Sequence, residues 1–195
     1  MAQQTTVETE CGLVRITASD KGVIAIDFVT NQAGKAQPRT TKAEGQTEDR
    51  AAALMDEAEQ QVREYFAGQR RTFTMAVDLS AGTAFQRKVW RAITKIPYGR
   101  VRSYQWVAER VGGRQYARAV GMALGANPVP IVVPCHRVVA HDGSLGGFSC
   151  GLPIKRRLLK LEGTLEQLER VGAVREASFV TCEMRETLQI PRGLR

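Results

Sequence analysis

The run NPVPIVVPCHRVVA, residues 127–140, restricts the possible folds of this chain more than any other stretch. Its three prolines argue against a regular helix and against a central sheet strand, because proline lacks the backbone N–H that both structures use. The other residues of the run are mostly apolar. The run therefore predicts a rigid, extended and buried segment, with Cys135, His136 and Arg137 in its middle.

The basic charge of the chain is concentrated in one segment. The 195 residues carry a net charge of +8, but residues 1–80 have a net charge of −3, residues 81–163 of +11 and residues 164–195 of zero. A basic segment on a near-neutral chain is typical of a protein that binds a polyanion such as nucleic acid. Judged by charge alone, a basic surface that binds no partner explains this distribution equally well.

The sequence argues against two classes of protein. No stretch of about 20 apolar residues is present, which excludes a membrane-spanning helix. The first residues, MAQQTT, contain neither the basic nor the apolar run of a secretory signal, so we expect none. The four cysteines are then expected to be cytosolic thiols rather than a disulfide framework.

Local patterns predict an α/β N-terminal domain over residues 1–80. Its expected elements are a hairpin within residues 12–30, a surface loop over 31–48, a helix over 49–67 and a strand over 71–79. A mainly helical domain follows over residues 81–163, with helices over 83–96, 104–111, 115–124 and 153–162. The role of residues 164–195 is not indicated by their sequence.

The helix predicted over 115–124 has a face of small residues, on which Ala117, Gly121 and Gly125 follow one another at intervals of four. Arg118 projects from the same helix. Such a face by itself favours tight helix–helix packing. Because a glycine turn joins this helix to the one before it, inside the basic segment, the pair indicates a helix-turn-helix that contacts nucleic acid.

Cys135-His136 is the strongest candidate for chemistry. A neighbouring histidine can lower the pKa of a cysteine and produce the reactive thiolate. Adjacent residues of an extended segment point in opposite directions, so contact between them requires a turn or a bridging water. A carboxylate would orient the histidine, and residues 81–163 offer Glu109, Asp142 and Glu162. The alternative is an inert core cysteine.

A zinc site is disfavoured. Cys135, His136, His141 and Cys150 could supply four ligands, but their spacing fits no common finger or ribbon.

The run around Pro134-Cys135-His136-Arg137 closely resembles the active-site signature of the O6-alkylguanine-DNA alkyltransferases, also called methylated-DNA–protein-cysteine methyltransferases. The resemblance extends to Phe85–Trp90 and to Ala117–Gly121, and covers about residues 83–163. It implies a ribonuclease-H-like N-terminal domain, with a small sheet plus a helix, before a winged-helix-like helix-turn-helix. It also implies that the alkyl group of O6-alkylguanine, and of O4-alkylthymine, moves from duplex DNA to Cys135 after base flipping, once per molecule.

The resemblance assigns roles residue by residue. Its catalytic set is Cys135 as the nucleophile, His136 as the histidine that activates it through a water, Glu162 as the carboxylate that orients this histidine, Asn127 as a brace of the active-site turn, and Tyr104 as a phosphate contact that assists proton donation. Its DNA-binding set is Tyr104, Ala117, Arg118, which replaces the flipped base in the stack, Ala119, Gly121 and Arg137. Its alkylguanine pocket is Val138, Phe148, Ser149 and Cys150.

No cofactor and no metal are implied. Residues 1–80 contain no histidine, so they cannot copy the structural zinc site of some family members. The expected partner is alkylated double-stranded DNA, bound through the minor groove by a monomer, and the sequence leaves cooperative binding open. The expected location is the cytoplasm, with the nucleoid in a prokaryote, or the nucleus in a eukaryote.

Two other classes of function stay open at this point. One is a protein that recognises alkylated bases without repairing them, against which Cys135 argues. The other is a cysteine hydrolase, which would turn over and would not need DNA or a basic segment.

The charge of residues 81–163 generates a prediction about salt. Affinity for duplex DNA should fall at least about tenfold between roughly 50 and 200 mM salt, because each neutralised phosphate releases counterions. A fluorescence-anisotropy titration measures this dependence, and an affinity that stays constant would contradict the predicted basic DNA-binding face.

Overall fold

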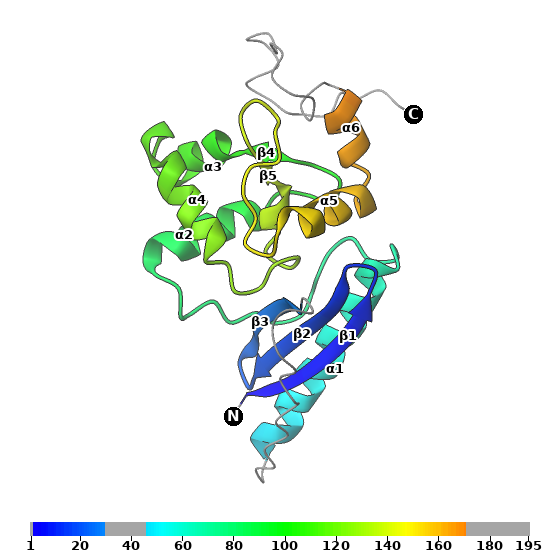
Figure 1. The fold of residues 1–195 in the computed structure, drawn as a ribbon. Helices are drawn as coiled ribbons and strands as arrows, with labels where there is room; N and C mark the ends of the chain where they lie inside the picture. Colours follow the sequence, from blue (N-terminus) through cyan, green and yellow to red (C-terminus); the bar gives the residue numbers. More distant parts are fainter. Residues whose placement is uncertain (1, 30–45, 171–195) are drawn as a thin grey trace. The chain divides into compact units, whose positions relative to one another are not determined.

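The computed structural model describes residues 2–29 and 46–170 (Figure 1). The chain divides into two compact units, of which the first is Met1–Ala81 with Pro128–Val132 and the second is Gly82–Asn127 with Val133–Arg195. Within the predicted loop at 31–48, residues 31–45 lie outside the described residues. Residues 171–195 of the predicted tail lie outside them as well.

The first unit is a three-stranded antiparallel sheet with one long helix against it (Figure 1). Its elements are β1 (Gln3–Thr9), β2 (Gly12–Ser19), β3 (Gly22–Val29) and α1 (Gln46–Phe66). The pairing of β2 with β3 confirms the predicted hairpin. The sequence analysis missed β1, because this strand is mostly polar and only Val7 is fully buried in it.

The segment Pro128–Val132 returns to the first unit, although the sequence analysis placed it in the second domain. The N–H of Ile26 in β3 donates to the carbonyl of Pro128 at 2.8 Å. Ile131 is fully buried with a φ of +78°, the one positive φ outside glycine among the described residues. Because a β-branched residue avoids this conformation, packing rather than local preference sets the path of the segment.

The strand predicted over 71–79 is wrong. Only an isolated bridge between Val23 and Val77 forms there. The alternating apolar residues suit a strand, but the buried side chain of Gln61 on α1 takes the place of a strand partner. Its Oε1 accepts the backbone N–H groups of Thr74 at 2.8 Å and Met75 at 3.3 Å, and its Nε2 donates to the Thr74 hydroxyl at 2.8 Å.

The second unit is mainly helical. Its elements are α2 (Ala84–Thr94), β4 (Arg102–Ser103), α3 (Tyr104–Val111), η1 (Arg114–Tyr116), α4 (Ala117–Gly125), η2 (Cys135–Arg137), β5 (Val138–Val139), α5 (Leu152–Leu161) and α6 (Leu165–Arg170). Ser103 caps α3, and its side chain accepts from the Trp106 N–H. Gly112 and Gly113, with φ of +147° and +136°, turn the chain between α3 and α4 and complete the helix-turn-helix.

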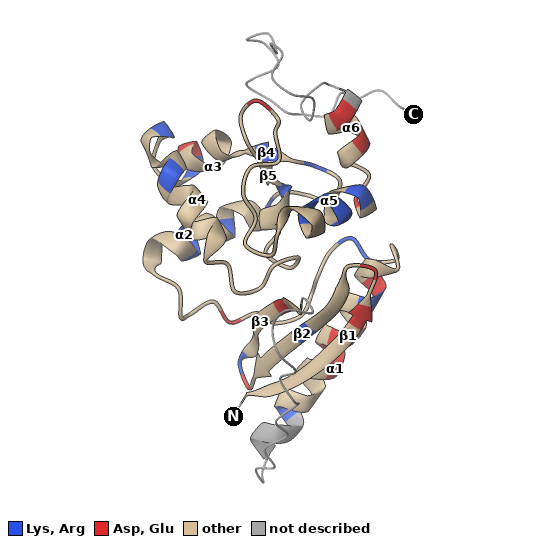
Figure 2. Ribbon diagram, viewed as in Figure 1, with Lys and Arg blue, Asp and Glu red and all other residues tan. Residues whose placement is uncertain are grey.

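The core of the second unit includes the first residues of the predicted tail. Leu165 and Leu168 of α6 are buried in a cluster with Val101, Val139 and Leu159. Figure 2 shows Lys and Arg on the helices of this unit and several Asp and Glu along α1 of the first. None of the helices in residues 46–170 has both the length and the apolar character needed to cross a membrane.

The interaction of Gln61 with the 74–75 backbone generates a stability prediction. In Gln61→Met, the N–H groups of Thr74 and Met75 lose their acceptor, and unfolding should become easier by about 2 kcal/mol. Urea unfolding measures this difference. The matched control is Gln60→Met, because Gln60 is exposed on the same helix and bonds only to Glu64 within the described residues. Equal effects of the two substitutions would contradict this role of Gln61.

Candidate active site

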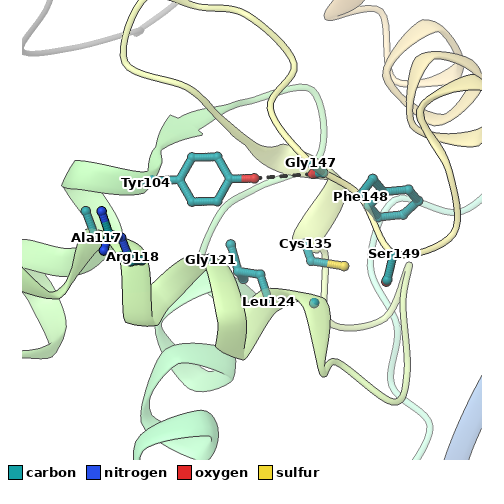
Figure 3. A pocket seen from close by; sticks show the side chains of 10 residues that line it. Tyr104, Ala117, Arg118, Gly121, Leu124, Cys135, Gly147, Phe148 and Ser149 are labelled. Atoms are coloured by element: carbon teal, nitrogen blue, oxygen red, sulfur yellow. Dashed lines mark hydrogen bonds between the residues drawn. The ribbon is translucent and has the colours of Figure 1, made fainter.

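A cavity of about 400 Å³ lies within the second unit, between α4 and the loop after β5 (Figure 3). Its lining combines the start of α3, one face of α4, the cysteine and the glycine-rich loop, residues 146–151. The lining residues are Tyr104, Ala117, Arg118, Gly121, Leu124, Gly125, Cys135, Gly147, Phe148 and Ser149. The fold thus brings together residues separated by up to 45 positions in the sequence around one sulfur atom.

Cys135 begins the short turn η2 and is 4% exposed. In Figure 3 its sulfur points toward the side of the pocket formed by Phe148 and Ser149. The amide of Asn127 donates to the sulfur at 3.0 Å and to the carbonyl of Val133 at 2.8 Å, which fixes the turn. Burial raises the pKa of the Cys135 thiol to about 11, against the effect of the Asn127 hydrogen bond. The thiol therefore needs a proton acceptor before it can react.

His136 is fully buried beside the cysteine, and its two ring nitrogens have different surroundings. Nε2 lies 2.9 Å from Oε1 of Glu162. Nδ1 is buried and has no hydrogen-bond partner among the described residues. Because an ionised carboxylate can only accept, the proton of a neutral imidazole lies on Nε2, and Nδ1 carries the lone pair. Burial lowers the pKa of His136, which Glu162 counteracts, so the ring is a base with Nδ1 as its acceptor.

Glu162 follows the last turn of α5, and its side chain is fully buried. Burial alone would raise its pKa, but His136 and Arg137 outweigh burial and lower this pKa to about 2. Arg137 donates to both carboxylate oxygens, with Nη2 2.8 Å from Oε1 and Nε 2.9 Å from Oε2. The Gly99 N–H adds a contact at 3.3 Å. The carboxylate is therefore ionised and held in one orientation.

Lys155 of α5 is a buried cation whose Nζ binds backbone carbonyls of β5 and of the loop that follows it. Its Nζ donates to the carbonyls of Val138 at 2.6 Å and Gly147 at 3.3 Å, and also to that of Leu145. Burial lowers the pKa of Lys155 to about 8. The lysine thereby holds the glycine-rich loop against β5 and sets the position of one pocket wall.

Tyr104, the first residue of α3, lines the pocket and contacts the loop after β5. Its hydroxyl donates to the carbonyl of Gly147 at 3.2 Å (Figure 3). Burial raises the pKa of Tyr104, so its hydroxyl keeps its proton at neutral pH and is available as a donor.

Most predicted site residues lie together, but several do not line the cavity. The interpretation of Arg137 as a DNA contact does not fit the structure, because this side chain is buried and bound to Glu162 and to the carbonyl of Ile96. Ala119 of α4, Val138 of β5 and Cys150 are absent from the lining residues. Val138 is fully buried, and Cys150 is half-buried with its sulfur 3.9 Å from the Ser149 hydroxyl.

The sequence analysis missed Lys155 and the lining residues Leu124 and Gly147. The burial of Lys155 could have been predicted from the sequence. This lysine interrupts the apolar stripe that Ile154, Leu158 and Leu159 form on α5. A lysine at such a position indicates a buried cation with acceptors. Within the described residues, no three His, Cys, Asp or Glu side chains gather to hold a metal ion.

Comparison with known proteins decides the family. The family model for the DNA-binding domain of 6-O-methylguanine DNA methyltransferases matches residues 84–164. The family model for the ribonuclease-like domain of the same enzymes matches residues 3–79. The chain belongs to the methylated-DNA–protein-cysteine methyltransferases. The enzyme class, the DNA-repair role and the two-part fold inferred from the sequence are confirmed.

Individual relatives match this chain over nearly their whole length. The methylated-DNA–protein-cysteine methyltransferase of Mycolicibacterium paratuberculosis is 41% identical over 83% of this chain and 93% of its own. That of Methanosarcina acetivorans is 36% identical over 80% and 96%. Mycobacterium tuberculosis OGT, crystallised in complex with DNA, superposes with a TM-score of 0.67 at 33% identity, over 82% of this chain and 92% of its own.

The glycine-rich loop generates a prediction at Gly146. A Cβ at this residue would lie 2.8 Å from the ring of Tyr104, and its φ of +63° disfavours any side chain. Gly146→Ala should therefore destabilise the fold by about 2 kcal/mol or more and displace Tyr104. Thermal unfolding measures the loss. Gly147→Ala is the control, because a Cβ there meets nothing within 4 Å; a comparable loss in both variants would show that Tyr104 does not set the requirement.

Proposed function

We propose that this methyltransferase removes the alkyl group from O6-alkylguanine in duplex DNA and keeps it on Cys135, so that each molecule acts once. The observation that carries the proposal is the arrangement of Cys135, His136 and Glu162, with Cys135 lining a cavity next to α4. We extend the proposal to O4-alkylthymine, because both lesions present an O-alkyl carbon to a thiolate.

The first step is the transfer of the thiol proton. His136 accepts it through Nδ1 by way of a bridging water, because Nδ1 has no direct partner among the described residues, and Glu162 stabilises the resulting imidazolium. Such help is required because burial keeps the thiol protonated. Asn127 donates to the sulfur throughout and stabilises the thiolate.

The second step is a displacement. The thiolate attacks the alkyl carbon, a C–S bond forms, and the C–O bond to the guanine breaks. The leaving base takes up one proton, so that the proton lost by the thiol balances the one gained by guanine. The Tyr104 hydroxyl, which is protonated and lies on the pocket wall, is the donor that assists this departure. The product thioether has no route back to a thiol within the site.

The DNA side of the proposal rests on α4. A cavity of about 400 Å³ can hold a single base, which must leave the duplex stack to enter. Ala117 and Gly121 leave the pocket mouth without bulky side chains, which suits close approach to a minor groove. Arg118 is exposed at the same mouth and is placed to fill the gap that the base leaves in the stack.

An intact-mass measurement tests this function. The pure protein is incubated with a duplex that carries one O6-methylguanine. We expect a gain of one methyl group per molecule, mapped to Cys135, and no further gain when fresh substrate is added. A duplex with O4-methylthymine tests the wider substrate class.

The controls are two cysteine substitutions. Cys135→Ala should abolish the mass gain, whereas Cys11→Ala, which removes a thiol between β1 and β2, should preserve it. Tight lesion binding without mass gain would indicate a recognition protein instead. Continued product formation beyond one equivalent would indicate an enzyme that turns over.

A further inference from the structure

The proposed mechanism leaves one buried charge without a role. Arg137 follows His136 directly, is 5% exposed, and lies in the interior rather than on the DNA-binding surface. Burying a guanidinium is costly unless its donors are satisfied. The chain provides that satisfaction through Glu162 and the Ile96 carbonyl, which Nη1 reaches at 2.7 Å.

Arg137 and His136 share one carboxylate oxygen. Oε1 of Glu162 lies 2.9 Å from His136 Nε2 and 2.8 Å from Arg137 Nη2, and Oε2 accepts from Arg137 Nε at 2.9 Å. The arginine thus makes a two-pronged contact with the same group that orients the histidine. The two charges of this pair cancel when the imidazole is neutral, whereas a protonated imidazole would leave a net positive charge in the interior.

We propose that Arg137 is a positioning residue for the methyl transfer: by sharing Glu162 it holds His136 neutral, with Nδ1 unprotonated and ready to accept the thiol proton. A lone carboxylate would favour the imidazolium instead. The inference rests on the proposed function, because it gives a reason why the base is unprotonated before substrate arrives.

Among the charges around His136, Lys155 acts in the same direction as Arg137, and Glu162 opposes both. Burial lowers the pKa of His136 most, Glu162 raises it, and Arg137 and Lys155 lower it further. Cys135, the remaining titratable neighbour on η2, is a neutral thiol before it reacts. The basic residues of α2, which also packs against η2, lie near the surface: Lys88 and Arg91 are exposed, and Arg87 donates to the Gly82 carbonyl.

The test is the titration of the His136 imidazole, followed by NMR in the full chain without DNA. The chain has only two histidines, so the exposed His141 provides the internal reference, and His141→Gln assigns the signals. In Arg137→Met the pKa of His136 should rise by roughly one to two units, because Glu162 then acts on it without compensation. An unchanged or lower pKa would overturn the proposal.

A double variant controls for simple loss of structure. Arg137→Met with Glu162→Gln removes both charges, so the pKa of His136 should fall back below that of the single variant. If Arg137→Met fails to fold, Arg137→Lys replaces it. Lysine keeps the charge without the two-pronged contact, and the pKa of His136 should then stay within about half a unit of wild type. A rise of one unit or more in Arg137→Lys would overturn a role based on charge.

The rate of methyl transfer supplies the second readout. The acidic limb of the single-turnover rate should move to higher pH in Arg137→Met, by the same shift as the imidazole pKa. A lower rate with an unmoved limb would assign Arg137 a merely structural role. Failure of the wild type to accept a methyl group would instead refute the proposed function, and the NMR result would still stand.

Discussion

The buried carboxylate of Glu162 is the interaction on which the active site depends. It ends α5, yet it binds two consecutive residues of η2 and the backbone at Gly99, so one charged group joins three distant parts of the second unit. A carboxylate near a helix C-terminus is electrostatically unfavourable, since that end of the helix is already partly negative. Arg137 offsets this cost by bringing positive charge to both oxygens of Glu162.

A second set of contacts positions the sulfur rather than the base. Asn127 holds the cysteine turn from one side, and Lys155 holds the glycine-rich loop against β5 from the other. Both use neutral backbone carbonyls as acceptors, so neither adds negative charge near the thiol. The Cys135 sulfur is thus held by a neutral amide, and burial keeps the pKa of its thiol high.

The parts of the site that depend on neighbouring residues in the sequence could be predicted from it. The Pro-Cys-His-Arg run and the helix-turn-helix both depend on local patterns, and the structure has the two helices where they were expected. Arg137 shows the limit of that reasoning. The family resemblance implied a DNA contact for it, but its side chain is buried against Glu162, 25 residues later in the chain. The error at residues 71–79 has a similar cause, since the side chain of Gln61 replaced the expected strand partner.

The return of Pro128–Val132 to the first unit affects how such a protein can be divided. A cut between residues 81 and 82 would leave Pro128–Val132 on the second fragment, although these residues pack in the first unit. They would then lose the hydrogen bond from Ile26 of β3. They lie between Asn127 and Cys135, which both belong to the second unit. Recombination that exchanges the N-terminal half must preserve a partner for the Pro128 carbonyl, and the two halves are therefore expected to change together during evolution.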